Sequence, residues 1–206
     1  MKIIIKATDR QWEELAGGSG DVDWIRVTDA SAFLTHTDAS AYMNLEEDMI
    51  LPFYGNLQKP VLINSVAHTL AEMQAPANVY RINGWPGFLS RTVWELAGHT
   101  DDRVMETGSG LGKKFIFVTD EPGFVAARVI AMVVNEAYFA LADGVSSKPE
   151  IDTAMKLGTN YPYGPFEWAS MIGTVNIAGL LLKLNITDIR YTPSALLLEE
   201  AKQVNP

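Results

Sequence analysis

The sequence predicts an α/β domain over residues 1–119 followed by an all-α domain over residues 120–206. Up to residue 119, short β-rich runs alternate with helix-like segments, which is typical of a small parallel or mixed sheet with helices. After Asp120 the chain changes to apolar helical segments separated by glycine, proline and capping residues. A chain of 206 residues is long enough for two small domains of this kind.

The elements expected in the first domain are short. Strands are predicted where β-branched and aromatic residues cluster, at residues 2–6, 24–27, 60–63, 79–82 and 115–118. Helices are predicted at residues 9–15, 68–73 and 90–97. Gly17, Gly18 and Gly20 follow the first of these helices, so we interpret them as a linker.

The second domain is predicted to consist of helices with readable ends. Pro122 suits the first turn of a helix, because its missing N–H would have no partner there, and this helix runs to about Ala142. Ser147 and Glu150 have the spacing of a capping box and open a second helix that ends at Gly158. The remaining helices are expected between Gly164 and Gly173, over residues 176–184 and over residues 193–203.

The helix predicted at residues 122–143 indicates a homodimer. From position 124 to 142 its charged or amide residues are Arg128, Asn135 and Glu136, so the helix is apolar almost all round. A domain of roughly 85 residues has too little interior to bury every face of such a helix. We expect a second subunit to cover it; the alternatives are the first domain or burial at the centre of a monomer. A membrane span is a poorer interpretation, because the charges of Arg128 and Glu136 would be costly in lipid.

Composition excludes several classes of function. The formal net charge of −9 and the isoelectric point near 4.8 argue against a nucleic acid as partner. The sequence has no cysteine, which excludes thiolate metal sites and a cysteine nucleophile. Its three histidines are scattered and do not have the spacing of a metal site. The apolar run at the N-terminus is too short for a signal peptide, and we expect a cytoplasmic protein.

The second domain carries a series of motifs at characteristic positions. They are Asp120-Glu121-Pro122-Gly123-Phe124 with Arg128, Ile151-Asp152-Thr153-Ala154-Met155 with Gly158, Pro162 with Gly164-Pro165-Phe166, and Arg190-Tyr191-Thr192-Pro193. In order and spacing they resemble the C-terminal domain of 3-hydroxyacyl-CoA dehydrogenases. The resemblance implies a helical domain of that kind, preceded by a shortened Rossmann-like α/β domain.

The resemblance also implies a cofactor, NAD, which the family binds where its first strand leads into a G-x-G-x-x-G turn. Here the first strand leads into Ala7-Thr8-Asp9, which has no glycine and carries a charge that would repel a phosphate. The glycine-rich run at residues 108–112 precedes a strand rather than a helix, which is the wrong context. We therefore predict no bound cofactor, and expect NAD only if the chain is an active dehydrogenase.

Four site positions follow from the resemblance. The family uses a His polarised by a Glu as general base, with a Ser and an Asn beside the substrate. Glu95 matches the Glu and Ser65 matches the Ser, so these two are the candidate catalytic residues. Asn83 stands at the His position and cannot take up a proton near neutral pH, and Ala127 stands at the Asn position.

Other residues could compensate for these losses. Glu95 and His99 are four residues apart and would share a face if their helix continued, although Gly98 favours a loop. Seven aromatic residues could line an acyl pocket or simply pack the core. They are Trp85, Phe88, Trp94, Tyr161, Tyr163, Phe166 and Trp168.

Three functional hypotheses follow. The first is a diverged family member without conventional NAD chemistry, a dimeric binding or regulatory protein for an acyl-CoA-like ligand. The second is an active NAD-dependent 3-hydroxyacyl-CoA dehydrogenase of fatty-acid metabolism. The third is an enzyme of another reaction with Glu95 as general base. The altered site positions place the first hypothesis ahead, because function depends on the site rather than on the fold.

Overall fold

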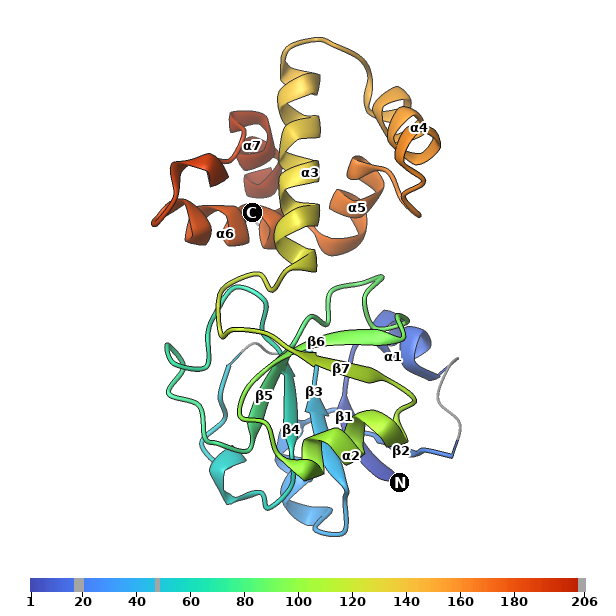
Figure 1. Cartoon of the computed structure of the whole chain (residues 1–206), viewed down its shortest axis with the longest axis vertical. Coiled ribbons are helices and arrows are strands. Elements are labelled where there is room, and N and C mark those ends of the chain that lie inside the picture. Colours follow the sequence, from blue (N-terminus) through green and yellow to red (C-terminus); the bar gives the residue numbers. More distant parts are fainter. Residues whose placement is uncertain (17–20, 47–48, 204–206) are drawn as a thin grey trace. The chain divides into compact units, whose positions relative to one another are not determined.

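The structure is a computed structural model that describes residues 1–16, 21–46 and 49–203. The linker that we predicted at Gly17, Gly18 and Gly20 lies outside the described residues. The chain divides into two compact units, Met1–Phe124 (unit 1) and Val125–Pro206 (unit 2; Figure 1). The sequence placed the division between residues 119 and 120.

Unit 1 is built on a seven-stranded sheet with the strand order β2-β1-β3-β4-β5-β6-β7 (Figure 1). The strands are β1 Lys2–Lys6, β2 Asp23–Arg26, β3 Ala41–Asn44, β4 Val61–Asn64, β5 Val79–Ile82, β6 Val93–Ala97 and β7 Lys114–Phe117. Neighbouring strands are parallel except β5 and β6, which are antiparallel. Because β2 lies on one side of β1 and β3 on the other, the strand order reverses between β1 and β3, as in Rossmann-like folds.

Helices cover both faces of the sheet, which explains why most side chains of its central strands are apolar. The helices of unit 1 are α1 Asp9–Ala16, η1 Ala30–Thr35, η2 Tyr54–Asn56 and α2 Asp102–Gly110. In β1, Ile3 and Ile5 belong to the core cluster on the side of α1 and α2, whereas Ile4 belongs to the cluster with η1 and η2. All three isoleucines are fully buried, and each burial stabilises the fold by about 1.5–3 kcal/mol.

The five predicted strands of unit 1 are confirmed, but β3, β6 and α2 were missed. β3 has the sequence Ala-Tyr-Met-Asn, which contains no β-branched residue. β6 has the sequence Val-Trp-Glu-Leu-Ala, and its helix-forming residues produced the prediction of a helix at residues 90–97. That prediction is wrong because pairing with β5 and β7 outweighs the local propensity. The helix predicted at residues 68–73 is also wrong, since residues 70–74 form turns.

All regular secondary structure of unit 2 over residues 125–203 is helical. Its helices are α3 Ala126–Ala142, α4 Lys148–Thr159, α5 Pro165–Ile172, α6 Thr174–Asn185, η3 Ile189–Tyr191 and α7 Ala195–Gln203. The predicted helices are confirmed, and the capping box of Ser147 and Glu150 opens α4. α5, α6 and α7 pack against α3 and bury Ile130, Val134 and Tyr138 between them (Figure 1).

The start of α3 differs from the prediction. Gly123 and Phe124 adopt left-handed backbone conformations, with φ of 88° and 51°. Helical geometry therefore begins only at Ala126, and the prediction that Pro122 lies in the first turn is wrong. Gly123 instead donates its N–H to Val66 O at 2.7 Å, which fastens this turn to the rest of unit 1.

The amide at the centre of α3 has a structural role. Asn135 is 2% exposed; it donates to Thr192 O at 2.9 Å and accepts from Ser194 N at 2.8 Å. It thereby satisfies buried backbone groups just before α7 begins.

Over residues 1–16, 21–46 and 49–203, none of the helices combines the length and the apolar character that a membrane crossing requires.

Candidate functional site

The candidate site of unit 1 is the sheet edge where β1, β3, β4 and β5 end. These four strands are parallel, so their carboxyl ends share one edge. In open α/β sheets, ligands bind outside the carboxyl ends of the strands, at the point where the strand order reverses. In this chain the reversal point lies between β1 and β3. The segments that meet there are the β1–α1 turn and the residues that follow β3, β4 and β5.

The β1–α1 turn is closed by two side chains of its own. Thr8 donates its N–H to Gln11 Oε1 at 3.0 Å, and Gln11 donates its N–H to Thr8 Oγ1 at 3.3 Å. This reciprocal pair is a capping box, which satisfies backbone donors at the start of α1. In a dinucleotide site the start of this helix faces the pyrophosphate. The spacing T-x-x-Q could have been read from the sequence, but we did not identify it.

Gln11 also joins the ends of two other strands. Its side-chain amide donates to Leu45 O at 2.9 Å and to Gly84 O at 3.2 Å, and the residue is 5% exposed. Asn64 reinforces the junction, since it donates to Leu45 O at 3.1 Å and accepts from Gly84 N at 2.9 Å. Glycine is needed at position 84 because a Cβ would lie 2.8 Å from the Asn64 side chain. The side chains of Gln11 and Asn64 therefore occupy the space at the sheet edge where the strand order reverses.

The charges near this turn are already paired. Arg26 donates to Ala7 O at 2.8 Å and to Asp9 Oδ1 at 2.7 Å. The ammonium group of Lys6 lies 3.6 Å from the carboxylate of Glu46. The Asp9 side chain is 89% exposed at the start of α1, where it adds negative charge. These groups do not favour a pyrophosphate at the turn.

Three candidate site residues of unit 1, Ser65, Asn83 and Glu95, lie in one row across the sheet. Ile82 of β5 pairs with Asn64 of β4 in a parallel register and with Leu96 of β6 in an antiparallel register. The next residues along these strands are Ser65, Asn83 and Glu95, which therefore come to lie side by side. The sequence thus identified three neighbouring positions, although it placed Glu95 on a helix.

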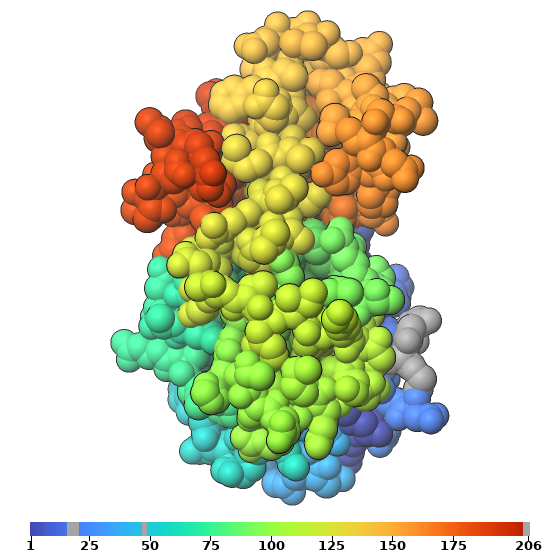
Figure 2. Space-filling view, in the orientation of Figure 1, coloured from blue at the N-terminus to red at the C-terminus, as the bar shows by residue number. Residues whose placement is uncertain are grey.

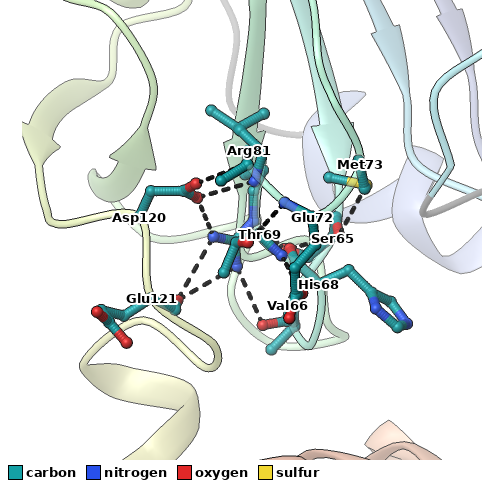
Figure 3. A network of polar contacts seen from close by, with 11 residues as sticks. Ser65, Val66, His68, Thr69, Glu72, Met73, Arg81, Asp120 and Glu121 are labelled. Atoms are coloured by element: carbon teal, nitrogen blue, oxygen red, sulfur yellow. Dashed lines mark hydrogen bonds and ion pairs between the residues drawn. The ribbon is translucent and has the colours of Figure 1, made fainter.

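Ser65 is held in a buried network (Figure 3). The residue is fully buried, and its hydroxyl donates to His68 O at 3.0 Å and lies 3.8 Å from Met73 Sδ. Its carbonyl oxygen accepts from Arg81 Nε at 2.9 Å. In this conformation the hydroxyl is engaged by its own loop rather than presented to a ligand.

Arg81 and Asp120 form the centre of this network (Figure 3). Arg81 is fully buried and pairs with Asp120 at 2.5 Å. Burial lowers the pKa of Arg81, and the hydrogen bond and charge of Asp120 oppose this shift. Asp120 also accepts from Leu70 N and Ala71 N, each at 3.1 Å. The Asp120 motif thus has a structural role, which the sequence did not reveal because Arg81 is 39 residues away.

Glu95 and Asn83 differ in their surroundings. Glu95 is half-buried on β6, and Asn83 is 8% exposed. Asn83 Oδ1 accepts from Trp85 N at 3.2 Å, while its Nδ2 has no acceptor among the described residues. The helical face on which Glu95 and His99 would have met does not exist, because Glu95 lies on β6, which ends at Ala97, and His99 follows the strand.

The aromatic residues pack mainly within their own units. Trp94 stacks on Phe115 in unit 1, and Tyr163 contacts Trp168 edge-on in unit 2. A shallow cavity of about 640 Å³ lies between α4 and α5. Its lining residues are Asp152, Lys156, Pro162, Tyr163, Phe166, Glu167, Ser170 and Met171.

Ala127 is fully buried in α3 and offers no polar group. Over the described parts of the chain, no cluster of His, Asp and Glu could hold a metal ion.

Comparison with known proteins assigns the helical unit. The family described as 3-hydroxyacyl-CoA dehydrogenase, C-terminal domain, matches residues 123–200. The match covers the helical unit, which is therefore similar to the C-terminal domain of this family. It is 45% identical over 92 residues to 3-hydroxyadipyl-CoA dehydrogenase of Escherichia coli, a match that covers 44% of this chain and 19% of that protein. It is 40% identical over 100 residues to 3-hydroxybutyryl-CoA dehydrogenase of Clostridioides difficile, covering 48% and 36% of the two chains.

The fold of the whole chain is similar to that of a solved dehydrogenase. A crystal structure of (S)-3-hydroxybutyryl-CoA dehydrogenase from Ralstonia eutropha superimposes with a TM-score of 0.71 at 20% identity, covering 98% of this chain and 94% of that one. The predicted fold class, a Rossmann-like α/β domain followed by the helical domain of this family, is confirmed.

The comparisons overturn our first functional hypothesis. Relatives that are 45% and 40% identical over the matched region are named dehydrogenases, so a non-enzymatic binding or regulatory protein is a wrong interpretation. Asn83 and Ala127 depart from the residues that the resemblance implies, but the match to these dehydrogenases holds over about 100 residues despite them. The residues at the β1–α1 turn nevertheless do not fit a dinucleotide bound in the Rossmann manner, because Thr8 and Gln11 occupy the start of α1.

Proposed function

We propose that this chain acts in a 3-hydroxyacyl-CoA dehydrogenase reaction, the interconversion of a 3-hydroxyacyl-CoA and a 3-oxoacyl-CoA in fatty-acid metabolism. The observation that carries the proposal is the 45% identity over 92 residues to an enzyme of this class. The match covers 19% and 36% of the two curated relatives. The substrate is proposed as an acyl-CoA thioester, without further choice of acyl chain, and the protein as cytoplasmic.

The row of Ser65, Asn83 and Glu95 is our proposed substrate site. Glu95 is the proposed catalytic carboxylate, and its position on the central sheet makes it rigid. Asn83 contributes a buried amide donor that could bind the oxygen on C3 of the acyl chain. Ser65 would reach the substrate only if its hydroxyl turned away from His68 O.

The test uses acetoacetyl-CoA as the probe. We expect saturable binding by calorimetry, with a dissociation constant in the micromolar to millimolar range typical of metabolic enzymes. Glu95→Gln removes the proposed catalytic carboxylate with little change in shape. Loss of NADH or NADPH absorbance on adding acetoacetyl-CoA measures the complete reaction, and we expect this loss to be slower in the variant. A chain that neither binds acetoacetyl-CoA nor supports its reduction would overturn the proposal.

A homodimer formed through the helix at residues 122–143 is also proposed. In the structure this helix is α3. Val129 and Phe139 on α3 are 48% and 38% exposed, and Val125, directly before it, is 60% exposed. Figure 2 shows a strip of α3, in yellow, reaching the surface between the orange and red segments of unit 2. Large apolar side chains at an exposed helix face favour association with another subunit.

A further inference from the structure

We infer that Gln11 closes the reversal point of the sheet to a dinucleotide, so that the nicotinamide dinucleotide of the proposed reaction is held by a domain outside these 206 residues. This inference rests on the proposed function, because it concerns the cofactor of that reaction. Three features of the β1–α1 turn support it: its lack of glycine, the position of the Gln11 side chain and the local charge.

The backbone of the turn cannot approach a pyrophosphate. In a Rossmann site, glycines let the phosphate oxygens reach the main chain at the start of the helix. Here Ala7 is buried, with 1% of its surface exposed, and Thr8 turns its side chain back over the helix start to accept from Gln11 N. The volume that a phosphate needs therefore contains side-chain atoms.

Moving Gln11 aside would break several buried hydrogen bonds at once. Its amide group donates to Leu45 O and Gly84 O, and its Oε1 accepts from both the N–H and the hydroxyl of Thr8. Gln11 is the donor to the carbonyl oxygen of Gly84, and no other donor to that oxygen is found among the described residues. If Gln11 moved aside, this carbonyl group would lose its hydrogen bond. Leaving buried polar groups unsatisfied is unfavourable, so the closed state is the stable one.

The charge distribution acts in the same direction. The charges of Asp9 and Arg26 are paired with each other at 2.7 Å, so together they offer no net positive charge to a pyrophosphate at the start of α1. Arg26 stands at the end of β2, where a cation could attract a nucleotide phosphate. It is already bound to Ala7 O and Asp9 and thus holds the turn in its closed form.

A dehydrogenase that contains this chain therefore needs a second nucleotide-binding domain. The partner that fits is a Rossmann domain with an intact G-x-G-x-x-G turn, because that turn supplies what Ala7-Thr8-Asp9 lacks. In this arrangement the present chain contributes its helical unit and the proposed acyl-CoA site, and the partner domain contributes the nicotinamide.

The direct test is titration of the purified chain with NADH and with NADPH. We expect no saturable change in nucleotide fluorescence and no rise in melting temperature up to about 1 mM, the upper end of typical KM values. Saturable binding of either nucleotide that is lost in Thr8→Trp, which would obstruct the turn, overturns the inference.

A second measurement tests the role of Gln11 itself. Gln11→Glu keeps an acceptor for Thr8 N, because capping boxes use Glu or Gln alike. A carboxylate cannot donate to Leu45 O or Gly84 O, so we expect the melting temperature to fall by about 5–10 °C. The matched control is Gln58→Glu, an exposed glutamine, which should shift it by less than about 2 °C. Equal, small shifts for both variants would show that Gln11 does not close the site.

The two proposals fail in different ways. If the chain alone binds NADH at the turn, the inference is wrong and the proposed function is strengthened. If the chain does not bind acetoacetyl-CoA and does not support its reduction, the proposed function is wrong whatever the nucleotide titration gives. Binding of acetoacetyl-CoA without binding of a nucleotide is the result that we expect.

Discussion

Arg81 ties the segment that follows β7 to the loops of the sheet. Its guanidinium group is fully buried and reaches Asp120, Ser65 O and Val66 O. A buried guanidinium is stable only when its donors are paired, so the carboxylate and the carbonyl oxygens hold one another in place. The same contacts fix the loop on which Ser65 lies, which links the stability of unit 1 to the geometry of its proposed site.

Removing one member of this pair should destabilise unit 1 strongly. We expect Arg81→Met to lower the free energy of unfolding by about 3–5 kcal/mol in urea, because it removes the guanidinium partner of the Asp120 carboxylate and the donors to Ser65 O and Val66 O. Arg103 provides the control, since it pairs with Asp101 at 3.0 Å while 55% exposed. Arg103→Met should change the unfolding free energy by no more than about 1 kcal/mol. Similar effects of both variants would contradict the role of Arg81.

Glu150 should give unit 2 a specific dependence on acid. Hydrogen bonds from the Ser146 and Ser147 hydroxyls and from Ser147 N lower its pKa from 4.5 to about 2. A carboxyl whose folded pKa is depressed contributes stability above its unfolded pKa and loses it as pH falls through the folded value. The melting temperature of Glu150→Gln, which keeps an acceptor for the capping box, should be lower than wild type at neutral pH. The difference should shrink between pH 4.5 and about 2; parallel curves would contradict this assignment.

At the scale of elements, two glycines should respond in opposite directions to alanine. Gly179 lies inside α6, is exposed, and has open space around the position of a Cβ. Gly179→Ala should stabilise unit 2 by about 0.5–1 kcal/mol, because alanine restricts the unfolded chain and favours helix. Gly84→Ala should destabilise unit 1, since its Cβ would meet Asn64 at 2.8 Å. Chemical denaturation of both variants gives the comparison, and the same sign for both would refute this account.

Elements whose signals are local could be predicted from the sequence. The capping box of Ser147 and Glu150 places the start of α4 correctly, because both partners lie within one turn. β6 could not be predicted, since its strand state depends on β5 and β7 as neighbours. For the same reason, T-x-x-Q at Thr8 and Gln11 shows a helix start but not the bonds to Leu45 O and Gly84 O. Those bonds exist only because the strand order brings the ends of β3 and β5 to α1.

At the scale of the whole molecule, unit 2 leaves a stripe of apolar side chains along α3 exposed. Positions 125, 129, 132, 136 and 139 repeat at helical spacing and carry Val, Val, Met, Glu and Phe, so the stripe is apolar apart from Glu136. The interior of unit 2 buries the opposite side of this helix, including Ile130 and Val134. Unit 2 therefore buries one side of the helix and leaves this stripe exposed. We propose the stripe as the surface through which the dimer forms.

A charge in this stripe should separate the subunits. We expect light scattering to give about twice the chain mass of 22.6 kDa for the wild type, and a mass near 22.6 kDa for Val129→Asp. Val129 is 48% exposed, so aspartate there is solvated in the monomer and is desolvated only when a second subunit covers it. Leu157→Asp is the matched control, because Leu157 is 83% exposed on α4, away from the stripe. A dimer that persists in Val129→Asp but dissociates in Leu157→Asp would move the interface from α3 to α4, and a monomeric wild type would rule out the dimer.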